Sequence, residues 1–219
     1  NGSVTETKYP FALAEAFKGG HLDSLLSIDS LPGFLPSNKA VVYIDNHDIQ
    51  RGHAGGNNNL SHKNGAIYDL ANVFMLAWPY GYPKVMSSYD FDNSDQGPPL
   101  SHPIINASCS TEWICEHRRP IISSMVGFRK ITADMPVTNW RVIDDKVISF
   151  SRGNKGHVII NVGATAVDAA FVTSMAPGDY CNITAAKTAE NCQGGMLQVD
   201  NQGTLKITVA PMSAVVIKN

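Results

Sequence analysis

VVYIDNHD, residues 41–48, changes from apolar to polar at a single point of the chain. Its apolar half belongs to a β-prone run from Lys39 to Ile44, which is typical of a strand that is covered on both faces in a parallel sheet. Its polar half, residues 45–48, follows immediately. Four consecutive polar residues after a buried strand are costly unless they form hydrogen bonds or meet a ligand. This point therefore predicts a candidate site at the carboxyl end of the strand.

Strands and helices alternate around this point. We expect strands at residues 3–9, 39–44 and 83–87, and helices at residues 11–17, 66–78 and 120–131. Three strand–helix pairs in succession imply right-handed crossovers and parallel strands. Three pairs are too few for a closed (β/α)8 barrel, which takes about 250 residues. The first part of the chain is therefore expected to be an incomplete α/β fold.

The sequence changes character near Met135 and Pro136. Beyond them every apolar run is short and bounded by Gly, Asn or Asp, and the expected strands are residues 140–142, 147–152, 157–162, 167–172, 178–184, 196–199 and 205–216. Runs that recur at roughly 8 to 12 residues favour an antiparallel sandwich or barrel. We therefore divide the chain into an α/β unit of residues 1–135 and an all-β unit of residues 136–219.

The composition is that of a globular protein. Of the 219 residues, 43% are hydrophobic and 16% are charged, which excludes an intrinsically disordered or collagen-like chain. The formal net charge is -2 without a long run of one sign, so nucleic acid and anionic membranes are not expected as partners. The longest apolar stretch, residues 71–80, is shorter than the roughly 18 residues of a membrane span.

The four cysteines form two close pairs, Cys109 with Cys115 and Cys181 with Cys192. Of the three possible connectivities, the two local loops are the simplest, and a zinc site is the alternative, although neither pair has a CxxC spacing. Sequons at Asn1, Asn59, Asn106 and Asn182 agree with a secreted, extracellular protein in an oxidising compartment. The chain begins without an initiator Met, so we expect a mature or truncated product.

The polar cluster offers two carboxylates and two imidazoles, from Asp45, His47, Asp48 and His53. Side chains alternate along a strand, so Asp45 and His47 are expected to point one way and Asn46 and Asp48 the other. Asp48 alone is also a good helix-cap residue. A divalent-metal site of His47, His53 and Asp48 is a further alternative, although no HxH or HxxxH pair is present.

Longer motifs run through both parts of the chain. They are VVYIDNHDIQRGHAGG (41–56), FMLAWPYGYPKVMSSYDF (74–91), QGPP (96–99), the C-x5-C-E-H-R segment (109–118), NWRVID (139–144), SFSRGNKG (149–156) and PMSAVVIKN (211–219). Together they resemble the animal-type α-amylases of glycoside hydrolase family 13. The resemblance implies barrel units six to eight of a catalytic (β/α)8 TIM barrel, followed by an antiparallel Greek-key β-sandwich domain. It also implies both local disulfides.

The resemblance implies roles for individual residues. Asp48 matches the family's third catalytic carboxylate, which binds hydroxyl groups of the sugar at the cleavage point, and His47 matches the histidine beside it. His53 matches the substrate-binding histidine of a Gly-rich loop, which is one residue shorter here than in vertebrate members. Hydrogen bonds to the sugar hydroxyls that strengthen in the oxocarbenium-like transition state contribute several kcal/mol.

The family also implies bound ions and a substrate. Asn46 matches one chloride ligand, and Lys84 stands where another ligand is an Arg, so anion binding is expected to be weaker or altered. Calcium is expected for the full-length family, with ligands outside this chain. The implied partner is an α-glucan such as starch, glycogen or a maltooligosaccharide, and the full-length protein is expected to be a monomer.

The catalytic set of the family is incomplete in this sequence. Retaining hydrolysis needs a nucleophile and a general acid about 5 to 5.5 Å apart. The family's motifs for that Asp and Glu are absent, and Glu6 lies in VTETKY, which matches the sixth strand. We therefore expect an α-amylase segment that is inactive alone. The alternative is a non-catalytic carbohydrate-binding or interaction module.

Overall fold

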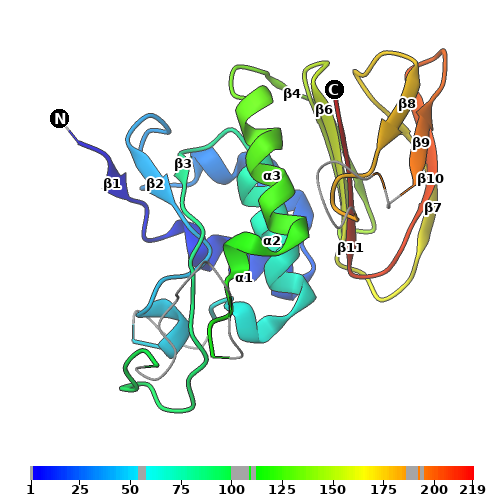
Figure 1. The fold of residues 1–219 in the computed structure, drawn as a ribbon. Helices are drawn as coiled ribbons and strands as arrows, with labels where there is room; N and C mark the ends of the chain where they lie inside the picture. The colour runs from blue at the N-terminus through cyan, green and yellow to red at the C-terminus, as the bar shows by residue number, and fades with distance from the viewer. Residues whose placement is uncertain (1, 54–57, 100–108, 110–111, 186–191, 193–194) are drawn as a thin grey trace.

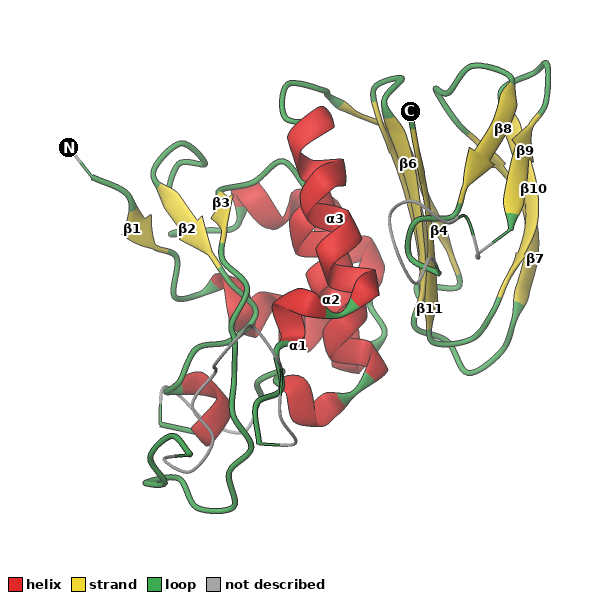
Figure 2. Ribbon diagram, viewed as in Figure 1, coloured by secondary structure: helices red, strands yellow, loops and turns green. Residues whose placement is uncertain are grey.

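The computed structural model describes residues 2–53, 58–99, 109, 112–185, 192 and 195–219. Figure 1 shows a small parallel sheet on one side, a group of helices in the middle and two antiparallel sheets on the other side. The helices therefore lie between the two kinds of sheet, as the colouring by secondary structure shows (Figure 2). None of the helices in these ranges has the length and apolar character needed to cross a membrane.

The parallel sheet has the order β1-β2-β3, with β1 at Val4–Thr5, β2 at Ala40–Val42 and β3 at Tyr82–Pro83. Both pairings are parallel, as predicted, and join Val4 to Ala40 and Val42 to Pro83. All three strands are shorter than the sequence predicts. Within the described ranges β1 and β3 each pair with β2 alone, so the sheet has two open edges.

Three α-helices cover one face of this sheet: α1 at Tyr9–Gly19, α2 at Ala66–Ala77 and α3 at Pro120–Ile131. The bounds of α3 agree with the prediction because Pro120 starts the helix, where its missing N–H has no role. The 3-10 segment η1, Leu22–Ser30, was not predicted. Its three buried residues, Leu22, Leu25 and Ile28, are too few for a clear helical pattern, and the backbone is non-helical at Ser27.

The rest of the chain forms two four-stranded antiparallel sheets. One sheet has the order β11-β6-β5-β4, and the other has the order β7-β10-β9-β8. The strands are β4 Val137–Ile143, β5 Val147–Arg152, β6 Gly156–Asn161, β7 Val167–Val172, β8 Gly178–Cys181, β9 Met196–Val199, β10 Thr204–Val209 and β11 Ser213–Lys218. The all-β architecture of this part agrees with the prediction.

The single strand expected at residues 205–216 is wrong. This run is divided between β10 and β11, which belong to different sheets. Pro211 cannot donate a ladder hydrogen bond, and Met212 has a φ of 47°, so the backbone turns between the two strands. The apolar pattern continues through the turn, and for this reason periodicity alone does not show the break.

Both predicted disulfides are confirmed. Cys109 pairs with Cys115 across a Cα–Cα distance of 6.1 Å, and Cys181 pairs with Cys192 across 5.5 Å. Each closed loop restricts the unfolded chain, which stabilises the fold by about 2 kcal/mol or more.

Of the sequons, Asn1 and Asn106 lie outside the described residues. Asn182 is buried, and its Oδ1 accepts hydrogen bonds from the backbone N–H of Thr184, the hydroxyl of Thr184 and the backbone N–H of Val216. The side-chain oxygen of Asn182 therefore serves the fold, by joining the end of β8 to β11.

Apolar packing joins the helices to the sheet that contains β5. Trp78 lies at the end of α2 and is 3% exposed, and its ring packs edge-on against Trp140 at 5.5 Å and Phe150 at 5.4 Å. Trp140 also stacks on Phe150. Trp78 is buried and Trp140 is half-buried against it, and one hydrophobic cluster spans the helices and this sheet.

A buried arginine completes the junction. The side chain of Arg152, at the end of β5, is fully buried. It donates to the carbonyl oxygens of Ala77, Thr132 and Met135, which lie at the ends of α2 and α3 and in the connection to β4. Arg129 adds hydrogen bonds to the carbonyls of Trp78 and Gly81. The carbonyls of Ala77, Trp78 and Thr132 belong to the carboxyl ends of α2 and α3. The two cations therefore satisfy groups that helix ends leave without partners and oppose the negative ends of the helix dipoles.

We predict that replacement of Arg152 by alanine lowers the free energy of unfolding by about 3 kcal/mol or more, because several buried carbonyls lose their donor. Arg152→Lys keeps the charge but presents fewer donors, so it should lose about half as much. Urea unfolding monitored by tryptophan fluorescence measures both. A change below about 1 kcal/mol in the alanine variant would contradict the proposed junction.

A second buried polar group lies between β5 and β6. His157 is 1% exposed, and its Nδ1 lies 2.9 Å from the Ser151 hydroxyl. Ser151 also accepts hydrogen bonds from the Asn139 amide and the Ser174 backbone N–H. Burial lowers the pKa of His157 to about 3, so the folded protein holds a neutral imidazole.

This lowered pKa predicts acid sensitivity. The unfolded chain takes up a proton at His157 below about pH 6.5, whereas the folded chain resists it down to pH 3. The group therefore costs stability progressively as the pH falls from about 6.5 to 3, by about 1.4 kcal/mol per pH unit at most. Comparison of unfolding free energies with those of His157→Gln isolates this contribution. Equal pH slopes in both proteins would contradict the buried neutral imidazole.

Candidate active site

The predicted site residues lie in the loop that leaves β2. Two residues after Ile44, Asn46 turns its side chain back onto the loop, and its Oδ1 accepts the backbone N–H groups of Asp48 at 3.0 Å and Ile49 at 2.8 Å. This Asx-type turn starts the short 3-10 segment η2, Ile49–Arg51. Asn46 therefore provides the cap that Asp48 alone could have supplied.

The carboxylate of Asp48 does not cap η2. It occupies the residue before η2 but makes no side-chain cap hydrogen bond, and half of its side chain is exposed. His47 lies beside it, 76% exposed, with Nε2 at 3.5 Å from Asp48 Oδ1. The structure thus places an acceptor and an imidazole side by side beyond the carboxyl end of β2. Such a pair suits a ligand that is rich in hydroxyl groups. The expected strand alternation, with His47 on the side of Asp45 and Asp48 on the other, is wrong, because β2 ends at Val42 and the chain turns at Asn46.

His53 joins the same turn through its backbone. Its N–H donates to the carbonyl of Asp48 at 3.0 Å, and the residue is exposed. Gly52 has a φ of 80° immediately before it, which ends η2 and which glycine adopts without strain.

Asp45 faces the interior instead. It is 3% exposed, and its Oδ1 accepts a hydrogen bond from the Tyr68 hydroxyl at 3.0 Å. Burial raises the pKa of Asp45 to about 7, the hydrogen bond from Tyr68 opposes the shift, and the charge of Glu116 adds to it. Asp45 and Asp48 therefore take different environments three residues apart, and only Asp48 is available to a ligand.

Further polar groups lie beneath the loop. Gln50 is buried and accepts a hydrogen bond from the Ser88 hydroxyl at 3.0 Å. The backbone N–H of Ser88 donates to Glu116, whose other oxygen is 3.8 Å from His62 Nδ1. Burial lowers the pKa of His62, and Glu116 opposes the shift. These contacts were not predicted from the sequence, because they join residues that are far apart and lie in separate motifs.

Arg51 fixes the loop that follows β3. Its guanidinium donates to the carbonyls of Ser94 and Gln96 and to the Tyr89 hydroxyl. The same group lies over the Phe91 ring at 4.7 Å from the centroid. Arg51 therefore connects η2 to residues 89–96 through hydrogen bonds and through a cation–π contact.

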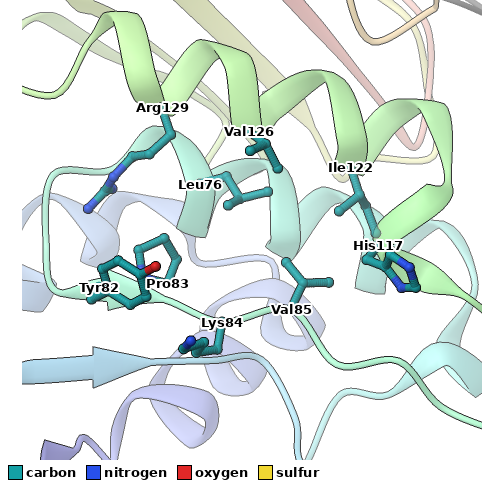
Figure 3. Close-up of a pocket in the computed structure, with 9 residues that line it drawn as sticks. All are labelled: Leu76, Tyr82, Pro83, Lys84, Val85, His117, Ile122, Val126 and Arg129. Carbon is teal, nitrogen blue, oxygen red and sulfur yellow. The ribbon is translucent and has the colours of Figure 1, made fainter.

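Lys84 is placed apart from this turn. It continues β3, and its Nζ lies 5.0 Å from the centroid of the Tyr82 ring. It also borders a pocket of about 350 Å³ between β3 and α3 (Figure 3). Asp48, His47 and His53 do not line this pocket. The sheet places Lys84 and Asn46 at the ends of neighbouring strands, β3 and β2.

Across the parts of the chain that the structure describes, no group of three or more His, Cys, Asp or Glu side chains is arranged to hold a metal ion.

Known proteins match this chain over almost its whole length. Residues 139–219 match the family model of the α-amylase C-terminal all-β domain. The chain is 38% identical to an α-amylase of Pecten maximus over 97% of its own length and 44% of that protein. It is 37% identical to an α-amylase of Streptomyces violaceus over 99% of its own length and 36% of that protein. The chain thus spans less than half the length of these curated relatives.

Solved structures agree. Wild-type α-amylase I from Eisenia fetida matches with a TM-score of 0.92 and 30% identity, over 100% of this chain and 49% of that one. A mutant of the same enzyme in complex with maltohexaose matches with a TM-score of 0.91 and 29% identity over the same shares. The predicted resemblance to the animal α-amylases is thereby confirmed, and residues 139–219 are similar to the α-amylase C-terminal all-β domains.

Proposed function

We propose that this chain is part of an α-amylase that cleaves internal α-1,4-glucosidic bonds of starch and glycogen with retention of configuration. Asp48 acts in it as the third catalytic carboxylate, and His47 and His53 bind the sugar. The observation that carries this proposal is the environment of Asp48. The carboxylate is half exposed, is not used as a helix cap and has His47 within 3.5 Å.

The chemistry supports this role. A sugar hydroxyl can donate to the carboxylate and accept from the imidazole, so the pair can hold one sugar ring in a fixed orientation. Positive charge develops on the sugar ring in the transition state, and a nearby carboxylate stabilises it. The maltohexaose complex of the Eisenia fetida relative supports an α-glucan as the substrate class.

The open sheet suggests how the site is completed. Tyr82 at the β3 edge is 62% exposed and Val126 on α3 is 56% exposed, and both border the pocket between β3 and α3 (Figure 3). We propose that residues 1–135 are units six to eight of a (β/α)8 barrel. A further parallel strand of the complete barrel then pairs with β3 and covers these side chains. Such burial would gain roughly 25 cal/mol for each Å² of apolar surface.

In the same proposal residues 136–219 form a Greek-key sandwich. The order β7-β10-β9-β8 supports this topology, because β8, β9 and β10 are successive neighbours and β7 lies beside β10.

The proposal also includes a bound chloride ion and a bound calcium ion in the full-length protein. The amide of Asn46 and the ammonium of Lys84 are donors that suit a chloride ion, with Lys84 offering a point charge rather than an arginine fork. A bound chloride would supply a fixed negative charge near the reacting carboxylates. Calcium is expected in the full-length protein, and no residue of this chain is assigned to it. The two disulfides support a secreted protein.

One prediction from this proposal concerns the isolated chain. It should not hydrolyse starch, because a retaining glycosidase needs two carboxyl groups about 5 to 5.5 Å apart and Asp48 has no such partner assigned here. A reducing-sugar assay on the purified 219-residue chain measures this. Starch cleavage at the rate of a complete α-amylase would contradict the prediction.

Another prediction from this proposal concerns Asp48 in the complete enzyme that carries this segment. Asp48→Asn keeps the shape but removes the negative charge, so kcat/KM on starch should fall by about a thousandfold. Asp23 is an exposed carboxylate on η1. Asp23→Asn is therefore the matched control and should leave kcat/KM unchanged. Full activity of Asp48→Asn would refute the proposed role and favour the alternative, in which this segment is a non-catalytic carbohydrate-binding or interaction module.

A further inference from the structure

Glu116 is a completely buried carboxylate at the start of the 3-10 segment η4, Glu116–Arg118. Its Oε2 accepts the backbone N–H of Ser88 at 2.8 Å. Its Oε1 has no hydrogen-bond donor among the described residues and lies 3.8 Å from His62 Nδ1. A buried carboxylate with an incomplete set of donors is costly, and an apolar side chain of similar size would be cheaper at such a position. Stability of the fold alone therefore does not explain Glu116.

A line of hydrogen bonds leads from Glu116 to the candidate site. Glu116 holds the backbone of Ser88, and the Ser88 hydroxyl donates to Gln50 Oε1 at 3.0 Å. Gln50 lies in the middle of η2, two residues after Asp48, and its own N–H donates to the carbonyl of Asn46. Ser88 and Glu116 are both fully buried, so water does not compete for these bonds.

The same carboxylate acts on the groups around it. Its charge adds to the raised pKa of Asp45 and opposes the lowered pKa of His62. Lys63, Asp90 and Arg119 are the other charged groups that act on His62. Glu116 thus acts electrostatically on residues that precede and follow Asp48 in the sequence.

We propose that Glu116 is a positioning residue that holds η2, and with it the carboxylate of Asp48, through Ser88 and Gln50. The effect on catalysis rests on the proposed function, whereas the effect on the η2 segment does not. Glu116 touches no substrate in this account. It acts by fixing the segment on which the sugar-binding carboxylate is mounted, in the way that supporting hydrogen bonds fix catalytic groups generally.

Amide hydrogen exchange in the 219-residue chain tests the first step. All four amides of residues 49–52 donate hydrogen bonds, so their exchange reports local opening. Ser88→Ala and Glu116→Ala should speed their exchange by about tenfold relative to amides of β5 and β6, which serve as an internal reference. Glu116→Gln keeps an oxygen for Ser88 and should stay within about threefold of the wild type.

Glu6→Gln is the matched control. Glu6 is a buried carboxylate too, but it accepts the N–H groups of Lys8 and Leu35 and has no hydrogen bond to η2. This variant should leave residues 49–52 unchanged relative to the reference strands. Unchanged exchange in both Ser88→Ala and Glu116→Ala, or equal loosening in the Glu6 control, would overturn the proposal.

Kinetics of the complete enzyme test the second step. kcat/KM should fall in Glu116→Ala and Ser88→Ala, recover in Glu116→Gln and stay unchanged in Glu6→Gln. A loosened η2 with unchanged kcat/KM in Glu116→Ala would overturn the positioning role. Failure of the proposed function itself appears separately, as an unaltered kcat/KM in Asp48→Asn.

Discussion

Arg152 is the contact on which the arrangement of the whole chain depends. Its guanidinium leaves an antiparallel strand and satisfies carbonyls at the ends of two helices that belong to the parallel α/β part. Burial, reinforced by the charge of Arg129, lowers the pKa of Arg152 to about 10, which still leaves the cation charged at neutral pH. Because the surrounding tryptophans and Phe150 pack into one cluster, the helices and the β5 sheet form one body. The loops of the candidate site therefore extend from elements that share one packed hydrophobic cluster.

The candidate site shows how burial assigns different roles to similar residues. Asp45 and Asp48 are both aspartates in one polar stretch, yet Asp45 is enclosed with Tyr68, and Asp48 faces solvent beside His47. The difference arises from the Asx turn at Asn46, which changes the direction of the chain between them. Gln50 and Arg51, next along the chain, then fasten the segment to Ser88 and to the loop at residues 89–96. The exposed carboxylate is thus held from both sides.

Much of this could be predicted from the sequence, and the failures have physical reasons. The parallel sheet, α3, the all-β part and both disulfides follow from local pattern and spacing. The 205–216 run was misjudged because an apolar pattern continues through the turn at Pro211. The roles of Glu116, Ser88 and Arg152 were not predicted, because each depends on contacts between residues that are dozens of positions apart. Motif resemblance pointed to Asp48, but only the fold shows that Asn46, rather than Asp48, caps η2.

The most direct test of the account is a crystal structure of the complete enzyme that carries this segment, with maltohexaose bound. The account predicts the Asp48 carboxylate at about 3 Å from hydroxyl oxygens of one glucose ring, with the His47 imidazole on the same ring. A sugar chain bound elsewhere, with Asp48 in contact with protein atoms alone, would contradict it.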